Sequence, residues 1–316
     1  MHRVGFRFSL TILGLVLWVC SSWSFAAQQG STAEGVPAHM VVTVEAHHGS
    51  NVPVINREDV MVYEGRDRDK VVDWVPAQGD QAGLEIFVLL DDGSSDSLGT
   101  QLEQIHKFIN AQPASTKIGV AYMQDGVARI AQNLTTDHAL AAKALRLPLG
   151  MSGVNGSPYF SVSDLIKKWP ESQSRREVFM ATDGIDRYYG GADLLDPYLA
   201  AAISDAQRAG VLVYAIYTPG VGHFSHSYWR SYWGQLYLAQ LTDETGGESY
   251  YIGYTGPPVD FTPFLEDAAN RWNHQYLLTF LAKPQKKAGL QSVKLKTEVP
   301  NAELVSADRV YVPAAP

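Results

Sequence analysis

Hydrophobic and polar residues alternate in short runs near both ends of the chain. Within 40–78 such runs predict strands at 41–45, 60–63 and 71–74, separated by turns that contain glycine or asparagine. The same pattern returns within 275–313 and predicts strands at 276–281, 291–297, 304–305 and 310–312. The two segments are expected to form one small β domain, and two separate β tails are the alternative.

The middle of the chain, 82–274, has a different pattern. Largely apolar runs at 84–90, 177–182 and 211–217 are typical of strands that are buried on both faces. Further strands are predicted at 118–122, 127–131 and 248–252, the second as a hairpin partner, and helices at 98–109, 139–147, 162–169, 194–209, 229–244 and 261–272. This alternation predicts an α/β domain with a doubly wound, mainly parallel Rossmann-like sheet. The domain is inserted in, or flanked by, the small β-sandwich-like domain.

The N-terminal residues 1–26 have the pattern of a secretory signal peptide. Two arginines precede an apolar run at 8–19, and Ser24 and Ala26 have the spacing that signal peptidase prefers. We expect cleavage after Ala26, export to the periplasm or the medium, and a disordered lead-in over 27–39. The apolar run is too short for a stable membrane span, and an uncleaved anchor is the alternative.

Composition and charge narrow the function. The chain has 316 residues and a net charge of −8, which becomes −10 without residues 1–26, because these hold two arginines and no acidic residue. An acidic chain with no basic run argues against nucleic acid as a partner. Removal of residues 1–26 also removes Cys20, the only cysteine. Disulfides and thiolate chemistry are thereby excluded from the exported chain, and the absence of cysteine favours a bacterial exported protein, since secreted eukaryotic domains tend to carry disulfides.

Oxygen-bearing side chains follow the buried strands of the predicted sheet. Asp91 and Asp92 follow the run at 84–90, Asp183 follows the run at 177–182, and Ser157 precedes a predicted helix. In a doubly wound sheet such loops meet at the carboxyl ends of the strands, where ligands bind. An all-oxygen set suits a hard divalent cation, Mg²⁺ or Mn²⁺ and secondarily Ca²⁺, rather than zinc.

The order of these motifs resembles the von Willebrand factor type A (VWA) domain and its metal-ion-dependent adhesion site (MIDAS). In that family a strand leads into an Asp-x-Ser-x-Ser loop, a threonine loop follows, and a second strand ends in an aspartate. The run at 41–74, Thr245-Gly246-Gly247 and the segment 275–278 are similar to the bacterial "VWFA-related" proteins frequent in Acidobacteria. The resemblance covers nearly all of 40–313.

The resemblance implies a metal site at four positions. They are Asp91, Ser95, Ser157 and Asp183, and Asp92 and Asp96 are candidates for a peripheral role. Gly93 departs from the family, which has a serine hydroxyl there. A further water can replace the missing hydroxyl on Mg²⁺, or neighbouring side chains can shift into the gap. A loop that has lost its metal is the alternative.

The resemblance also implies recognition rather than catalysis. The family's cation leaves one coordination position open, and a carboxylate of a protein partner completes it. A metal-independent scaffold or assembly subunit, acting through the β domain or the aromatic loop at 223–233, is the second hypothesis. No hydrolase or nucleotide-binding motif occurs, and the histidine pairs lack a third zinc ligand, so we expect no enzymatic activity.

Aromatic residues gather in and around 223–237. Trp229, Trp233, Leu236 and Leu241 have roughly helical spacing, so core packing is expected for part of this set. Others are candidates for an exposed surface that binds a partner: Tyr188, Tyr189, Phe224, His226 and Tyr228.

Overall fold

The structure is a computed structural model, and it describes residues 35–79, 83–94, 98–150, 156–190, 196–220 and 227–315. The predicted signal peptide and residues 27–34 of the predicted lead-in lie outside these ranges. The part of the lead-in that is described is not disordered, because the first strand begins at Val36.

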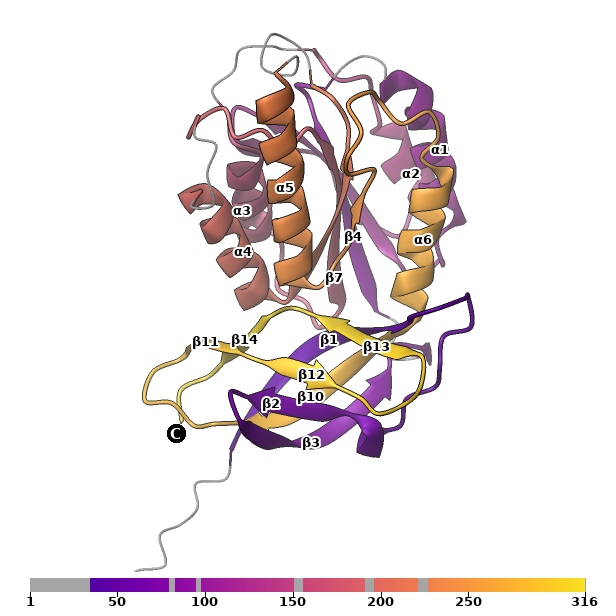
Figure 1. Ribbon diagram of the computed structural model, residues 1–316. Coiled ribbons are helices and arrows are strands. Elements are labelled where there is room, and N and C mark those ends of the chain that lie inside the picture. Colours follow the sequence, from indigo (N-terminus) through magenta and orange to yellow (C-terminus); the bar gives the residue numbers. More distant parts are fainter. Residues whose placement is uncertain are drawn as a thin grey trace, which may run out of the picture. The chain divides into compact units, whose positions relative to one another are not determined.

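A six-stranded sheet forms the centre of the α/β part (Figure 1). Its order is β6-β5-β4-β7-β8-β9, and every neighbouring pair is parallel except β5 with β6. The strands are Leu84–Asp91 (β4), Lys117–Gln124 (β5), Val127–Thr135 (β6), Arg175–Thr182 (β7), Val211–Tyr217 (β8) and Ser249–Tyr250 (β9). The chain runs from β4 to β5 on one side and later returns to β7 on the other side, so the winding direction reverses at β4.

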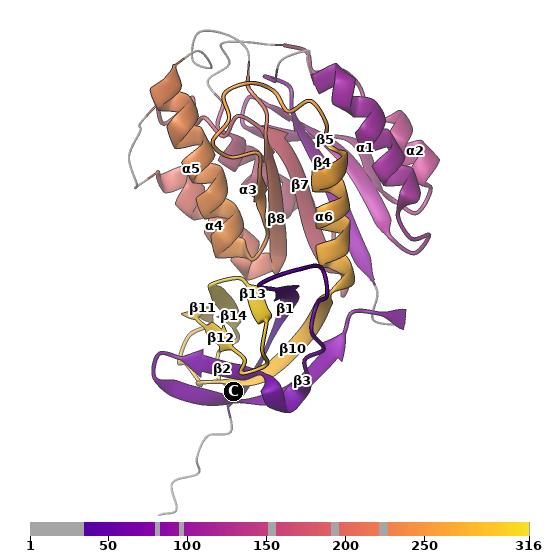
Figure 2. The ribbon, with the colours of Figure 1, turned by 45° about the vertical axis from the view of Figure 1, so that its right-hand side comes forward.

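Helices cover both faces of this sheet (Figure 2). One apolar core includes side chains of Gly99–Ala111 (α1), His138–Lys143 (α2) and Thr262–Asn273 (α6). The other includes side chains of Pro158–Lys168 (α3), Pro197–Ala209 (α4) and Tyr228–Thr245 (α5). Every residue of β4 and of β8 is buried, as the largely apolar runs predict. Among the helices that the structure describes, none is both long and apolar enough to cross a membrane.

A second six-stranded sheet combines strands from the two ends of the described chain. Its order is β12-β2-β3-β10-β1-β13, and β1 pairs with both β10 and β13. A separate two-stranded sheet joins β11 to β14. The elements are Val36–Ala46 (β1), the 3₁₀ turn Arg57–Asp59 (η1), Met61–Glu64 (β2), Asp67–Pro76 (β3), Gln275–Ala282 (β10), Gly289–Ser292 (β11), Lys294–Lys296 (β12), Ala302–Ser306 (β13) and Arg309–Val312 (β14).

The predicted fold class is confirmed. A doubly wound, mainly parallel α/β sheet lies in the chain between β3 and β10, which are hydrogen-bonded neighbours in the β sheet. The apolar side chains of that sheet form a core of their own, which includes Val42, Val62, Leu278 and Phe280.

Several predicted elements differ in their bounds, and three of them do so for a local reason. The helix predicted at 162–169 begins at Pro158, because the Ser157 hydroxyl accepts a hydrogen bond from the backbone of Tyr159 and caps the helix. The helix predicted at 139–147 ends at Lys143, since the Tyr122 hydroxyl donates to the carbonyl of Ala144. The strand predicted at 291–297 is divided at Val293 between two sheets, where its N–H bonds the carbonyl of Asp308.

A buried polar network links the two sheets. The Arg175 guanidinium, at the start of β7, donates to the Trp272 carbonyl at 2.8 Å and to Gln275 Oε1 at 2.5 Å. The amide of Gln275, the first residue of β10, donates to Glu177 Oε1 at 3.0 Å. Burial, opposed by Arg175 and by this hydrogen bond, raises the pKa of Glu177 to about 8.

Candidate functional site at the carboxyl edge

The loops that follow β4, β7 and β8 meet at one edge of the α/β sheet. We call the described residues 91–94, 183–190 and 218–220 the carboxyl edge. An isolated bridge between Ser94 and Gly220, with a 3.2 Å hydrogen bond between Ser94 Oγ and Thr218 Oγ1, joins two of the loops. Because the winding direction reverses at β4, this edge is where a doubly wound sheet binds its ligands.

Asp91 closes strand β4 with a buried carboxylate. Its Oδ2 accepts a hydrogen bond from Thr182 Oγ1 at 2.6 Å, and its Oδ1 accepts one from the backbone N–H of Gly93 at 2.8 Å. Burial and then the neighbouring Asp183 raise the pKa of Asp91, whereas Arg187 lowers it. At Gly93, where the resembled family has a serine, the backbone therefore supplies a donor to the first aspartate.

Asp183 forms an ion pair with Arg187, four residues later in the same loop. Arg187 Nη1 donates to Asp183 Oδ1 at 3.1 Å, and Nη2 contacts Oδ2. The Asp183 side chain is 1% exposed and that of Arg187 is 12% exposed, so little water screens the pair. Burial lowers the pKa of Arg187, but the Asp183 carboxylate, and after it those of Asp91 and Asp186, raise it overall.

Ser157 is bound to a carboxylate that the sequence analysis did not select. Its hydroxyl donates to Asp186 Oδ2 at 2.5 Å. The other oxygen, Asp186 Oδ1, accepts from the backbone N–H groups of Tyr188 and Tyr189, both at 2.8 Å. The backbone N–H of Arg187 donates to the Gly156 carbonyl at 3.2 Å, so a second hydrogen bond joins the segment before α3 to the loop after β7.

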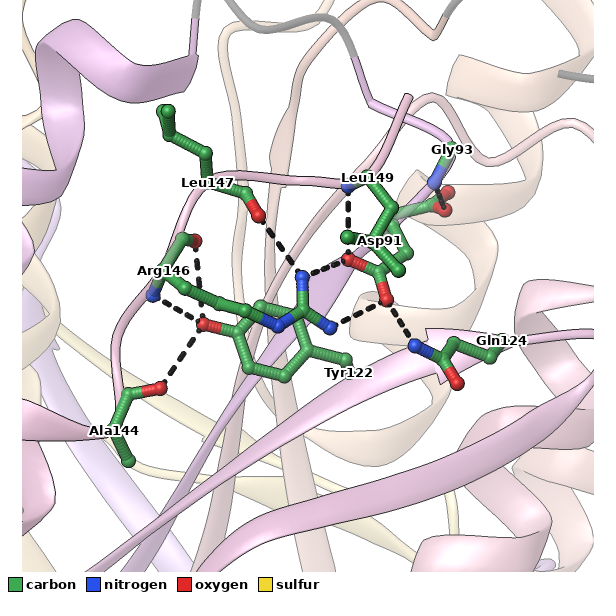
Figure 3. Close-up of polar contacts among 9 residues, drawn as sticks. Asp91, Gly93, Tyr122, Gln124, Ala144, Arg146, Leu147 and Leu149 are labelled. Carbon is green, nitrogen blue, oxygen red and sulfur yellow. Dashed lines mark hydrogen bonds and ion pairs between the residues drawn. The ribbon is translucent and has the colours of Figure 1, made fainter. Parts of the chain in front are cut away.

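Asp92 belongs to a second ion pair, with Arg146. Figure 3 shows Arg146 beside the ring of Tyr122. The two terminal nitrogens of Arg146 donate to Asp92 Oδ1 and Oδ2 at 2.6 and 2.7 Å. Gln124 Nε2 donates to Oδ2 at 2.5 Å, and the guanidinium carbon of Arg146 lies 3.8 Å from the ring centroid of Tyr122. Each carboxylate oxygen of Asp92 is thus bound by a guanidinium N–H.

The structure brings Asp91, Ser157 and Asp183 of the predicted metal site to the carboxyl edge. Predicted ligands Ser95 and Asp96, and the predicted partner-binding residues Phe224 and His226, lie outside the described residues. Sequence reasoning missed the partners of the predicted residues, which are Thr182, Asp186, Arg187 and Arg146. The spacing of Asp183 and Arg187 was a usable signal, whereas Arg146 lies 54 residues from Asp92.

The described carboxylates of this edge are bound to donors of the chain itself. Both carboxylate oxygens of Asp183 contact Arg187, and the Ser157 hydroxyl oxygen accepts a hydrogen bond from the backbone N–H of Tyr159 at 3.2 Å. Within the described ranges, no group of three or more His, Cys, Asp or Glu side chains has the geometry to hold a metal ion. As they are arranged, these residues fit an internal cation and do not fit a divalent ion.

Exposed aromatic rings lie next to the buried Asp186 in the loop after β7. Tyr188 and Tyr189 follow Arg187, and their rings pack edge-on against Tyr198 at centroid distances of 5.4 and 6.3 Å. Phe160 packs on Tyr188 and Tyr198 at 5.3 and 4.3 Å. We call Tyr188 and Tyr189 the aromatic turn, and Tyr188 is 57% exposed.

A second exposed set lies in the first turns of α5, which begins at the Ser227 cap. We call Tyr228, Trp229 and Tyr232 the α5 aromatic face, and their exposed fractions are 75%, 58% and 50%. Core packing was expected for part of the set Trp229, Trp233, Leu236 and Leu241. Leu241 is buried and Trp233 packs against the core, whereas Trp229 is exposed. Because α5 buries Tyr237, Leu238 and Leu241 against the sheet, Trp229 faces away from the core.

Comparisons with known proteins gave structural similarities only. No family model matches the sequence, and no curated protein is similar to it in sequence. The chain is similar to an aerotolerance-related membrane protein from Bacteroides fragilis, with 15% identity over 60% of this chain and 99% of that one and a TM-score of 0.41. It is similar to the conserved hypothetical protein BatB from Bacteroides thetaiotaomicron, with 17% identity, 60% and 97% coverage and a TM-score of 0.39. It is also similar to a von Willebrand factor type A protein from Catenulispora acidiphila, with 11% identity, 91% and 75% coverage and a TM-score of 0.43.

Proposed function

We propose that this chain is an exported, non-enzymatic binding protein with a VWA-type domain that recognises a protein partner through its carboxyl edge. The contact surface is formed by the aromatic turn and the α5 aromatic face. The buried carboxylates beneath these rings shape the edge and do not themselves contact the partner.

The distribution of exposed and buried groups at the edge carries this proposal. Asp91, Asp183 and Asp186 are buried and bound to internal donors, whereas Tyr188, Tyr228 and Trp229 expose more than half of their side chains. A partner that approaches this edge therefore meets aromatic rings before it meets a carboxylate. Tyrosine and tryptophan are enriched at protein interfaces because they combine a large apolar area with a polar tip.

Two features of the sequence support export. Residues 1–26 have the charged flank, apolar run and small-residue site of a signal peptide, and residues 27–316 contain no cysteine. The mass of the protein recovered from the cell envelope and from the medium tests this directly. A chain that begins at Ala27 supports export with cleavage, and a chain that retains residues 1–26 contradicts the cleavage.

Quantitative affinity capture tests the proposed surface. A tagged wild-type protein is compared with the triple variant Tyr228→Ser, Trp229→Ser and Tyr232→Ser, with extracellular and envelope proteins of the source organism as prey. We expect a partner that the wild type enriches and that the triple variant loses at least tenfold, which corresponds to about 1.4 kcal/mol. Capture in EDTA is expected to be unchanged.

The matched control changes exposed residues that lie far in sequence from the carboxyl edge. Val54→Ser, before η1, and Tyr311→Ser, in β14, alter side chains that are also exposed. If these variants lose the partner and the triple variant keeps it, the β sheets are the binding surface and the proposal is wrong. Loss of capture in EDTA alone would instead favour the metal-mediated recognition of a partner carboxylate that the VWA resemblance implies.

A further inference from the structure

We infer that the Arg187 guanidinium takes the place of a divalent cation at the carboxyl edge, so that the edge keeps its structure and its aromatic turn without metal. The inference rests on the proposed function in one respect, since it concerns what fixes the position of the aromatic turn in the proposed binding surface. Its evidence is the charge balance of the edge, the anchoring of Arg187 and the connection from Asp186 to the aromatic turn.

The charge balance requires a cation. The carboxylates of Asp91, Asp183 and Asp186 lie close enough to Arg187 to raise its pKa, and all three are buried. Carboxylates that share a site repel one another unless a positive group lies among them. Arg187 supplies that group from within the loop, and Arg146 does the same for Asp92.

Arg187 is anchored at both ends of its side chain. Its backbone N–H donates to the Gly156 carbonyl, and Nη1 donates to the Ile185 carbonyl at 3.3 Å as well as to Asp183. The two terminal nitrogens together engage both oxygens of one carboxylate, a geometry that fixes the orientation of a guanidinium. A divalent ion that approached Asp183 would have to displace this group or bind against its charge.

The same loop holds the aromatic turn. Asp186, one residue before Arg187, accepts the backbone N–H groups of Tyr188 and Tyr189 and the hydroxyl of Ser157. Arg187 is therefore a positioning residue. It neutralises the carboxylate cluster that includes Asp186, and Asp186 in turn binds the backbone of the aromatic turn. In this arrangement the surface is presented permanently and does not depend on the supply of a metal.

The first test needs no partner. The melting temperature of the purified protein is measured in EDTA and then with millimolar MgCl₂, MnCl₂ or CaCl₂, and Mn²⁺ binding is followed by electron paramagnetic resonance. We expect no bound Mn²⁺ and no rise in Tm. A site filled at 100 times its Kd would raise Tm by about 5 °C, so occupancy is readily detected. One bound Mn²⁺ that Asp183→Asn abolishes would overturn the inference.

Arg187→Met supplies the converse test, since methionine keeps much of the side chain and removes its charge. In EDTA we expect Tm to fall by roughly 10 °C, as for a buried ion pair that loses one partner, and we expect Mn²⁺ to restore part of it. Arg187→Lys keeps the charge and should remain insensitive to Mn²⁺. Arg129→Met, which changes an exposed arginine of β6, should leave both Tm and the response to Mn²⁺ unchanged.

Two results for Arg187→Met would contradict the inference. These are an unchanged Tm, and a lowered Tm that no divalent ion restores. If this variant does not fold, the Mn²⁺ titration of the wild type still decides. All of these measurements are independent of partner capture, so failure of the aromatic surface and failure of the Arg187 inference are distinguishable.

Discussion

Gly184 and Gly234 bring the loop after β7 and helix α5 into direct backbone contact. A Cβ atom added at Gly184 would lie 2.3 Å from the carbonyl oxygen of Gly234, and one added at Gly234 would lie 2.3 Å from the carbonyl oxygen of Asp183. Gly184 also has a φ of +68°, which favours glycine. This contact joins the loop of the Asp183–Arg187 pair to the helix that carries the α5 aromatic face.

We predict that Gly234→Ala destabilises the protein by about 1–3 kcal/mol because the added methyl group overpacks this contact. In an exposed helix the same change would stabilise by about 1 kcal/mol, so the sign of the effect is diagnostic. Urea unfolding measures the difference. Gly256→Ala is the matched control, since nothing lies within 4 Å of its added Cβ atom. A stabilising Gly234→Ala would contradict the contact.

Thr182→Val should destabilise by roughly 1–3 kcal/mol at neutral pH, because it removes a donor to the buried carboxylate of Asp91. Thr218→Val removes a bond between two neutral hydroxyls and should cost about 1 kcal/mol. Denaturant unfolding of both variants gives the comparison. Equal losses would show that the charge of Asp91 does not depend on Thr182.

Arg146→Met should destabilise by about 2 kcal/mol, since it leaves the buried Asp92 carboxylate without its two charge-assisted hydrogen bonds. The Arg146 side chain is 38% exposed, so water that enters the site reduces the loss below that of a fully buried pair. Arg146→Lys should recover part of it, because lysine keeps the charge but not the planar fork. Thermal unfolding of the two variants checks this order, and an equal loss in both would contradict it.

The buried Glu177 predicts a pH dependence of stability. Its pKa of about 8 in the folded protein exceeds the ordinary glutamate value, so the folded state holds a proton that the unfolded state releases. Stability is therefore lost as pH rises from about 4.5 to 8, by at most about 1.4 kcal/mol per pH unit, and no further above that range. Glu177→Gln should remove this contribution.

The measurement is the difference in unfolding free energy between Glu177→Gln and the wild type at pH 5 and pH 8. We expect the variant to gain on the wild type as pH rises, because glutamine cannot ionise. Asp73→Asn, on an exposed position of β3, controls for the loss of a carboxylate. A difference that is constant with pH would show that Glu177 is ionised throughout.

The sequence by itself determined the architecture of this protein. The largely apolar run 84–90 and the apolar run 211–217 favour helices on both faces of a parallel sheet, because neither face of such a strand is suited to contact with water. The alternating runs at the two ends likewise predicted strands with one buried face. These patterns are local in the sequence, and they predict which faces of a strand are buried away from water.

Only the tertiary structure decided what the acidic loops do. Asp91 and Asp183 were found from their place after strands, and Ser157 from its place before a helix. Asp91 and Ser157 have partners in distant segments, Thr182 and Asp186, whereas Arg187 lies four residues after Asp183. An aspartate in a loop has the same sequence signature whether an ion or a guanidinium balances its charge. The choice depends on which cationic group the folded chain brings within hydrogen-bond distance, and here that group is Arg187.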